Sequence, residues 1–238
     1  MKYLYAKKRL DYTDYASGRV LYSLPNSPAF PVRLISEIFQ QVFAMFPADK
    51  KFQIYDPCCG CAYHLAVLGF LHSDKISEII ASDIDNDVLQ IAFKNLKLLN
   101  ASGFKERILE ISLMVEKFGK ESHIEALNSA KRLQTDIEIK YRIFQSDLLK
   151  SNFSDTLSGF KPDIIFADTP YGQTVNWQGN TAFDDFLYQI LENLKPLLKR
   201  ETVIVIATSK EDKAEHPDYE RLKKLKTADR QIRFFRIK

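Results

Sequence analysis

The stretch "KFQIYDPCCGCAYHLAVLGFLH" (residues 51–72) contains the change of pattern that decides the fold. Its first part, "KFQIYD" (51–56), has the composition of a strand, and "HLAVLGFLH" (64–72) has that of a helix. Between them lies a turn of small residues, where Gly60 lacks a side chain and tolerates unusual backbone angles. A strand, a tight turn and a helix in this order predict one unit of an α/β sheet.

The same alternation continues towards the C-terminus. Further strands are expected at residues 76–85, 138–147, 161–168, 201–209 and 231–238, and a helix at about 182–199. Another helix should follow the strand at 76–85, with Asp85 or Asn86 as its N-cap. Strands that alternate with helices favour an α/β fold with a mainly parallel sheet and helices on both faces.

Two segments fall outside that alternation. Residues 1–49 form an N-terminal extension with a helix, because apolar residues between Ile35 and Phe46 recur at helical spacing. The segment from 101 to about 137 is too long for a simple connection and has apolar residues at helical spacing, so a helical insertion is expected. With 45% hydrophobic composition, residues 1–238 are expected to form a single domain.

Composition restricts the classes of function. A net charge of +3 is weakly basic and does not by itself indicate a nucleic-acid partner. No apolar run reaches about 18 residues, and the first 20 residues lack the apolar core of a secretory signal, so a cytoplasmic protein is expected. Cys58, Cys59 and Cys61 lie too close together for a disulfide framework or a four-ligand metal site. The four histidines are scattered and receive no predicted role.

An acidic residue follows each of four predicted strands. These residues are Asp56, Asp83, Asp147 and Asp168. Ligands of such sheets bind beyond the carboxyl ends of the strands, so four acids there favour a ligand site over four independent caps. The single glycine of the first turn, with no P-loop lysine after it, disfavours a phosphate ligand. Asp83 is placed to accept ribose hydroxyls and Asp147 to face adenine, which points to S-adenosylmethionine.

The motifs "DPCCGCAYHL", "ASDIDNDVLQIAFKNL", "FQSDLL" and "DTPYG" resemble, in order, those of class I S-adenosylmethionine-dependent methyltransferases, which have a Rossmann-like fold. With "GRVLYSLPNSPAFPVRLISEIFQ" (18–40), the chain resembles the avilamycin-resistance type of 23S rRNA guanine methyltransferase. The resemblance assigns to the cofactor site Asp56, Cys58, Gly60, Asp83, Ile84, Asp85, Asp147, Leu148 and Asp168, with no metal. The resemblance implies that Asp83 accepts the hydrogen bonds of the ribose hydroxyls, with Asp85 as the alternative. Two positions depart from the family pattern: Ala62 replaces its second glycine and Thr169 its first proline.

The motif "DTPYG" (168–172) is the predicted catalytic loop. Methyl transfer from a sulfonium is a displacement, in which alignment matters more than a strong base. Asp168 can accept a hydrogen bond from the substrate nitrogen, Pro170 stiffens the turn, and Tyr171 can stack on a planar base. The alternative is a capped proline turn with a packed tyrosine.

Two basic clusters are candidates for binding RNA phosphates. Lys7, Lys8 and Arg9 form one cluster; Arg221, Lys223 and Lys224 form the other, with Arg230, Arg233 and Arg236 nearby. Trp177, the only tryptophan, could stack on a base or serve ordinary packing. Each basic cluster could equally be a solvated face.

The sequence thus predicts transfer of a methyl group to a guanine nitrogen in ribosomal RNA of the 23S type. The ring nitrogen and the exocyclic amine both remain open. The expected partner is ribosomal RNA or a ribosomal subunit, with no membrane and no obligate protein partner. Two alternatives stay open: a methyltransferase acting on a glutamine amide of a protein, and a non-catalytic RNA-binding or assembly factor with the cofactor fold.

Overall fold

The structure is a computed structural model that describes residues 2–24, 29–134, 136–150, 152–169, 183–210, 215–227 and 230–238. Three predicted site residues, Pro170, Tyr171 and Trp177, lie outside these ranges.

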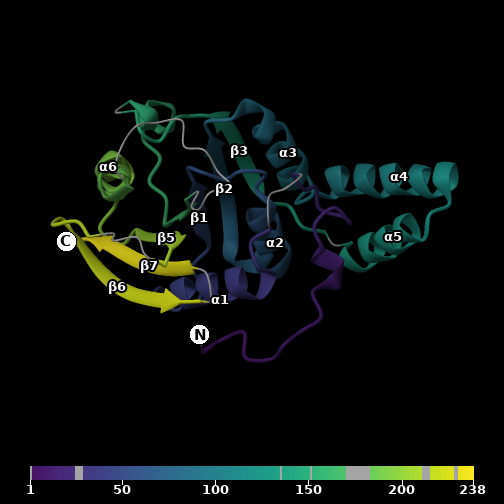
Figure 1. Cartoon of the computed structure of the whole chain (residues 1–238), viewed down its shortest axis with the longest axis horizontal. Helices are drawn as coiled ribbons and strands as arrows, with labels where there is room; N and C mark the ends of the chain where they lie inside the picture. The colour runs from purple at the N-terminus through teal and green to yellow at the C-terminus, as the bar shows by residue number, and fades with distance from the viewer. Residues whose placement is uncertain are drawn as a thin grey trace.

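The described residues form a seven-stranded sheet of order β3-β2-β1-β4-β5-β7-β6 (Figure 1). The strands are β1 (Phe52–Asp56), β2 (Ile76–Asp83), β3 (Lys140–Gln145), β4 (Ile164–Asp168), β5 (Val203–Ser209), β6 (Tyr219–Lys226) and β7 (Arg230–Ile237). The first five strands pair in parallel, whereas β7 pairs antiparallel with β5 and β6. The strand order reverses between β1 and β4, and a ligand crevice is expected at such a switch point.

Helices cover both faces of the sheet, as predicted. They are α1 (Val32–Phe43), α2 (Tyr63–His72), α3 (Asn86–Lys97), α4 (Ala101–Phe118), α5 (Glu121–Leu133) and α6 (Phe183–Leu194). Because side chains alternate along a strand, Ile54 packs in the core with α1, α2 and α3, while Tyr55 packs in a second core with α6. Figure 1 shows α6 and α2 on opposite sides of the strands.

The predicted helical insertion consists of α4 and α5, which form a hairpin that projects from the body (Figure 1). The expected N-cap of α3 is Asp85, whose carboxylate accepts hydrogen bonds from the backbone N–H groups of Asp87 and Val88. None of the helices in the described ranges is long and apolar enough to cross a membrane.

One strand was not predicted. Residues 221–226 were interpreted only as a basic cluster, but they belong to β6 at the edge of the sheet. Only Tyr219 and Leu225 of this strand are buried, so its apolar signal is too sparse to detect. Lysines are common on edge strands because they discourage pairing with other chains.

The N-terminal segment is fastened to α1. The carboxylate of Glu37 accepts hydrogen bonds from the backbone N–H groups of Leu4, Tyr5 and Ala6 at 2.7 to 2.9 Å. The guanidinium of Arg33 donates to the carbonyl groups of Ala6 and Lys7, both at 2.9 Å. These bonds fix the segment that carries the first basic cluster.

Candidate functional site

Asp56, at the end of β1, holds the first turn in place. The side chain is fully buried, and its Oδ1 accepts a hydrogen bond from the backbone N–H of Cys58 at 2.9 Å. Its Oδ2 lies 2.6 Å from Nε2 of His64 in the first turn of α2. Asp56 therefore frames the turn through bonds to the protein itself.

The pair of Asp56 and His64 is a feature that the sequence analysis missed, since His64 received no predicted role. His64 is buried and packs its ring against Phe166, 5.2 Å away between ring centroids. The two partners are eight residues apart and on different elements, so only the fold of the turn reveals their contact.

Gly60 and Asp83 join the first turn to the end of β2. Gly60 has a φ of 52°, and its N–H donates to Oδ2 of Asp83 at 2.9 Å. Oδ1 of Asp83 accepts a second bond from the N–H of Asp85 at 3.1 Å. Burial raises the pKa of the Asp83 carboxyl above its ordinary value. A Cβ atom at Gly60 would meet no heavy atom within 4 Å, so open space lies in front of this glycine.

Ala62, which the resemblance places at a glycine position, adopts a left-handed backbone conformation. Its φ is 53°, which is unfavourable for a residue with a Cβ by about 1 kcal/mol. Ala62 is fully buried and precedes α2 as its N-cap residue. The backbone therefore keeps the turn despite the departure from glycine.

Asn95 is a second residue that the sequence analysis missed. It is fully buried on α3, and its Nδ2 donates to the carbonyl oxygen of Cys61 at 2.8 Å and to that of Tyr22 at 3.0 Å. Its Oδ1 accepts from the N–H of Tyr22 at 2.8 Å. One amide thus ties the N-terminal extension to the first turn.

The loop after β3 lies against the end of β2. The N–H of Ser146 donates to the carbonyl oxygen of Asp83 at 3.0 Å. Asp147 accepts a bond from the N–H of Leu149 at 3.0 Å, and the buried Leu148 is held through its carbonyl by Asn193 of α6. These contacts place Asp147 beside Asp83, in keeping with the predicted adenine and ribose positions.

Asp168, at the end of β4, forms the other side of the site. Its neighbour Thr169 is fixed by two bonds, from its N–H and its Oγ1, to the carbonyl oxygen of Ala207 on β5. Nη1 of Arg230 lies 3.3 and 3.5 Å from the two carboxylate oxygens of Asp168. Burial raises the pKa of Asp168 to about 6, although the Arg230 guanidinium and His64 act to lower it.

The four acids lie along one edge of the sheet. Asp56, Asp83 and Asp168 end β1, β2 and β4, and Asp147 follows β3; these strands are neighbours in the order β3-β2-β1-β4 and run parallel. Burial raises the pKa of the Cys58 thiol, and the negative charges of Asp56, Asp83, Asp168 and Asp147 raise it further, in that order. The sequence-based inference that these acids share one site therefore has a geometric counterpart.

Comparisons with known proteins identify the family. The family described as rRNA methyltransferase AviRa matches residues 1–230. The chain belongs to this family. It is 39% identical over 210 residues to the 23S rRNA (guanine(2535)-N(1))-methyltransferase of Streptomyces viridochromogenes, covering 86% of this chain and 84% of that protein.

Solved structures agree with the AviRa assignment. The rRNA methyltransferase AviRa of Streptomyces viridochromogenes superposes with a TM-score of 0.89 at 36% identity, over 99% of this chain and 96% of that one. The Escherichia coli protein yhhF gives a TM-score of 0.52 at 14% identity, over 91% and 90% of the two chains, which shows the fold alone. The predicted Rossmann-like fold and the predicted family are confirmed.

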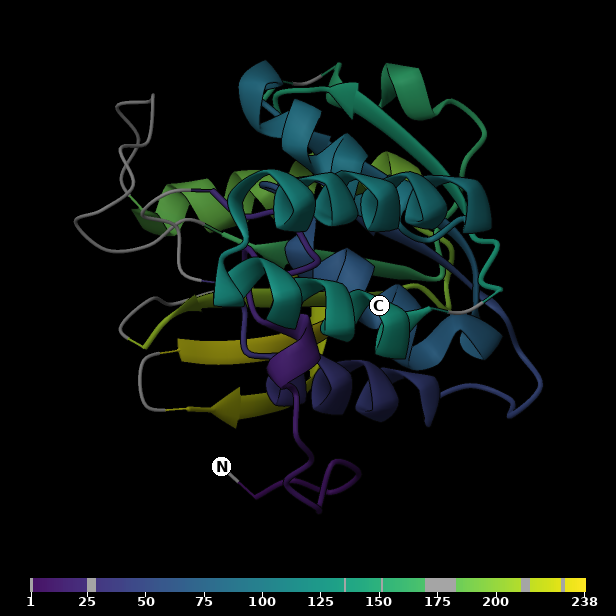
Figure 2. The same cartoon turned by 90° about the vertical axis from the view of Figure 1, so that its right-hand side faces the viewer.

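An rRNA methyltransferase of the AviRa family needs a surface for RNA, and the two predicted basic clusters differ in exposure. Lys7, Lys8 and Arg9 are all exposed on the fastened N-terminal segment. On β6, Arg221 and Lys224 are exposed and Lys223 is half-buried. Figures 1 and 2 both show the N-terminus beside the end of β6.

Positive charge accumulates on the second cluster. Slight burial and the charges of Arg233, Lys226 and Arg221 lower the pKa of Lys224 below its ordinary value. Arg233, however, is only 2% exposed and donates to Oγ1 of Thr208 at 3.0 Å, so it is a packed residue and the suggestion that it tracks phosphates was wrong. Arg230 lies beside Asp168, at the end of β4.

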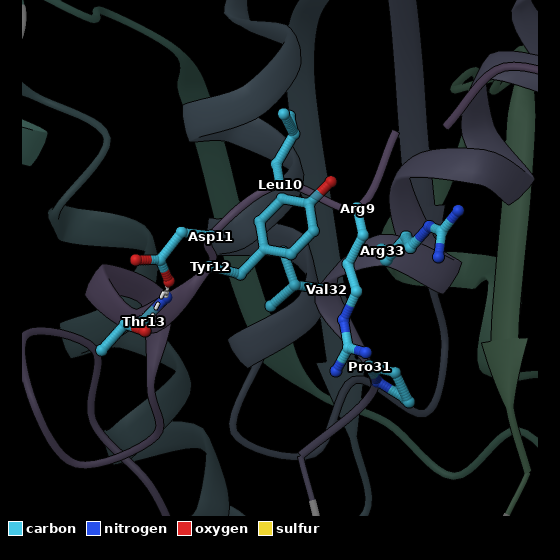
Figure 3. A pocket seen from close by; sticks show the side chains of 8 residues that line it. All are labelled: Arg9, Leu10, Asp11, Tyr12, Thr13, Pro31, Val32 and Arg33. Atoms are coloured by element: carbon cyan, nitrogen blue, oxygen red, sulfur yellow. Dashed lines mark hydrogen bonds between the residues drawn. The ribbon is translucent and has the colours of Figure 1, made fainter. Parts of the chain in front are cut away.

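A pocket of about 790 Å³ lies between the N-terminal segment and the start of α1 (Figure 3). It is lined by Arg9, Leu10, Asp11, Tyr12, Thr13, Pro31, Val32 and Arg33. Pro31 follows Phe30, whose ring lies 4.6 Å from the guanidinium carbon of Arg230.

Proposed function

We propose that the protein transfers the methyl group of S-adenosylmethionine to N1 of a guanine in 23S rRNA. The observation that carries this proposal is the position of Asp83, Asp147 and Asp168 along the carboxyl edge of the sheet, with Asp83 bonded to the open first turn at Gly60. The AviRa relative named as a guanine-N(1) methyltransferase favours N1 over the exocyclic amine.

The residues of the first turn fit this cofactor. Open space at Gly60 leaves room for a ligand to approach the backbone, and no phosphate-binding glycine pattern surrounds it. Asp83 and Asp147 supply acceptors for ribose hydroxyls and adenine. Asp83 is half-buried and bonded to the first turn at Gly60, whereas Asp85 is exposed and caps α3, which favours Asp83 as the ribose acceptor. When bound, the cofactor supplies an electrophilic methyl group on sulfur.

Asp168 is the group that meets the guanine. Its carboxylate accepts the N1–H hydrogen bond, orients the nitrogen and receives the proton as N1 forms its bond to the methyl carbon. The carbon–sulfur bond breaks at the same time, and its electron pair stays on sulfur. The raised pKa of Asp168 makes it a better proton acceptor than an exposed carboxylate while leaving it ionised at pH 7.

Transfer to defined substrates tests the proposal. The purified protein is incubated with labelled S-adenosylmethionine and with ribosomal subunits, free rRNA or total protein, and the products are digested for nucleoside mass spectrometry. We expect 1-methylguanosine in 23S rRNA. Label in protein would favour a glutamine-amide methyltransferase, and cofactor binding without transfer to any substrate would favour a non-catalytic RNA-binding factor.

Gly60→Ala should still fold but should bind the cofactor more weakly. The positive φ makes alanine unfavourable there by about 1–2 kcal/mol, which the fold should tolerate. The added methyl group enters the open space, so calorimetry should show affinity for S-adenosylmethionine reduced at least about tenfold.

Gly119→Ala is the matched control for this change. Gly119 has a φ of 57° and likewise no heavy atom within 4 Å of an added Cβ, but it lies at the turn between α4 and α5. This variant should lose similar stability and keep its cofactor affinity. Equal affinities of the two variants would show that the cofactor does not approach Gly60.

The two basic clusters are proposed to bind RNA phosphates. Changing Arg221, Lys223 and Lys224 together to glutamine should weaken RNA binding. It should also reduce the slope of log Kd against log salt by about 2 to 3 units, because fewer counterions are released. Filter binding at several salt concentrations measures both effects.

The control removes an equal number of exposed charges from the hairpin. It changes Lys117, Lys120 and Lys131 to glutamine. Both triple variants should keep wild-type cofactor affinity. If their RNA titrations coincide at every salt concentration, the cluster on β6 is only a solvated edge.

A further inference from the structure

The direction of β7 brings an arginine to the ligand edge of the sheet. Because β7 runs antiparallel to β5, its first residue, Arg230, pairs with Ser209 at the carboxyl end of β5. The backbone is fixed there, since the N–H of Thr227 donates to the carbonyl of Arg230 at 2.9 Å and the N–H of Arg230 donates to Oγ1 of Thr227 at 3.1 Å. A parallel strand would have carried its first residue to the opposite edge.

The Arg230 guanidinium is held over an aromatic ring. Its central carbon lies 4.6 Å from the centroid of Phe30, and Phe30 is itself packed edge-on against Phe166 at 5.6 Å. Side-chain exposure is 14% for Arg230 and 25% for Asp168, so both groups reach the surface of the site. A cationic donor and an anionic acceptor thus stand side by side where β4 ends.

The contact between the two groups is loose. Distances of 3.3 and 3.5 Å from Nη1 exceed the 2.7–2.9 Å of a charge-assisted hydrogen bond. A pair that served only to stabilise the fold would gain more from a shorter, two-pronged contact. Both side chains are also partly exposed, so a ligand can contact the two groups together.

The Watson–Crick edge of guanine matches this arrangement. It presents an acceptor, O6, beside a donor, N1–H, whereas adenine presents an amino donor beside the acceptor N1. When the base is held with N1 facing the carboxylate, an arginine on the other side therefore pairs with O6 of guanine and opposes the amino group of adenine, whose N1 also carries no proton. Charge left on the base when N1 loses its proton spreads to O6, where a guanidinium stabilises it.

We propose that Arg230 donates a hydrogen bond to O6 of the target guanine and so selects this base while Asp168 takes the N1 proton. The proposal rests on the proposed function and adds a specificity-determining residue to it. The donor and the acceptor of this step come from β7 and β4, both within the described part of the chain.

The experiment compares Arg230→Met and Arg230→Lys on an rRNA fragment that the wild-type protein methylates. Arg230→Met keeps an apolar contact with Phe30 and removes the charge. We expect its single-turnover rate to fall about 100-fold, as for loss of one charged donor to a developing negative charge. Arg230→Lys should recover part of the rate. Lys131→Met, which removes an exposed cation from the hairpin of α4 and α5, should keep the wild-type rate.

Altered bases locate the contact. Inosine keeps O6 and N1–H, so Arg230→Met should reduce the rate on inosine and guanosine by the same factor. In 6-thioguanosine a weaker acceptor replaces O6, so the same change should matter much less. If the variant loses the same factor on 6-thioguanosine, or none on guanosine, the O6 contact is wrong.

A pH profile tests the electrostatic contact between Arg230 and Asp168 on which the proposal depends. The groups that face Asp168 are Arg230 from β7, His64 from α2, and Asp56 and Cys58 from β1 and its turn. Since the guanidinium lowers the pKa of Asp168, its removal should move the acid limb of the rate profile to higher pH. An unmoved limb contradicts the proposal. Absence of wild-type transfer to guanosine would instead refute the proposed function, and wild-type transfer to guanosine but not inosine would indicate the exocyclic amine.

Discussion

Asp168→Asn should reduce single-turnover methyl transfer at saturating rRNA by at least about 100-fold, because asparagine cannot take the N1 proton. The change preserves the size of the side chain, so the loss reports on chemistry more than on packing. In the wild-type protein the rate should rise with pH up to about 6, the pKa of Asp168, and then level off, because the carboxyl must be ionised to accept a proton. The variant should lack this acid limb.

Two controls accompany this measurement. Burial disfavours the ionised form of Asp168, so its replacement by a neutral amide should leave the melting temperature nearly unchanged. Asp155→Asn removes an exposed carboxylate from the short 3₁₀-helix Phe153–Leu157 and should keep the full rate. Transfer near the wild-type level in Asp168→Asn would place the catalytic group elsewhere.

The positions of the four acids could be predicted because each follows a strand with a strong apolar pattern. In a parallel sheet the carboxyl ends of neighbouring strands share one edge, so Asp56, Asp83, Asp147 and Asp168 had to lie near each other. The pattern located the strands but not the hydrogen bonds. Asp56 proved fully buried and bonded within the turn, a distinction that depends on the first turn of α2.

The antiparallel end of the sheet was harder to predict. Along β6, charged side chains interrupt the apolar pattern, so the strand was interpreted as a surface cluster. The position of Arg230 follows from the pairing of β7 with β5. This pairing brings Arg230 next to Asp168, although the two residues are far apart in the sequence. The placement of Arg230 next to Asp168 thus depends on the topology of the sheet, which the local sequence pattern does not reveal.

The hydrogen-bond partners of His64 and Asn95 could not be predicted from the local sequence pattern either. His64 and Asn95 each lie on a helix whose apolar residues predict burial, but their partners, Asp56, Cys61 and Tyr22, belong to other elements. Burial of a polar side chain requires hydrogen-bond partners, so the sequence implies that such partners exist. It does not say which ones.

Asp83→Ala should weaken S-adenosylmethionine binding on the order of 100-fold, or about 3 kcal/mol. The change removes the acceptor for ribose hydroxyls. It also leaves the N–H groups of Gly60 and Asp85 without their acceptor, so the first turn should lose part of its preorganised shape. Isothermal calorimetry measures the affinity, and Asp83→Asn, which keeps one acceptor oxygen, should fall between alanine and the wild type.

Asp85→Ala decides between the two carboxylates. Asp85 accepts bonds from Asp87 and Val88 at the start of α3, so its loss should lower the free energy of unfolding by about 1 kcal/mol while cofactor affinity stays near the wild-type value. The two variants therefore have opposite expected profiles: Asp83→Ala loses mainly affinity, and Asp85→Ala loses mainly stability. The opposite result would be strongly weakened cofactor binding in Asp85→Ala with unchanged affinity in Asp83→Ala. It would assign the ribose contact to Asp85, because a capping carboxylate that also bound the ligand would lose both stability and affinity when removed.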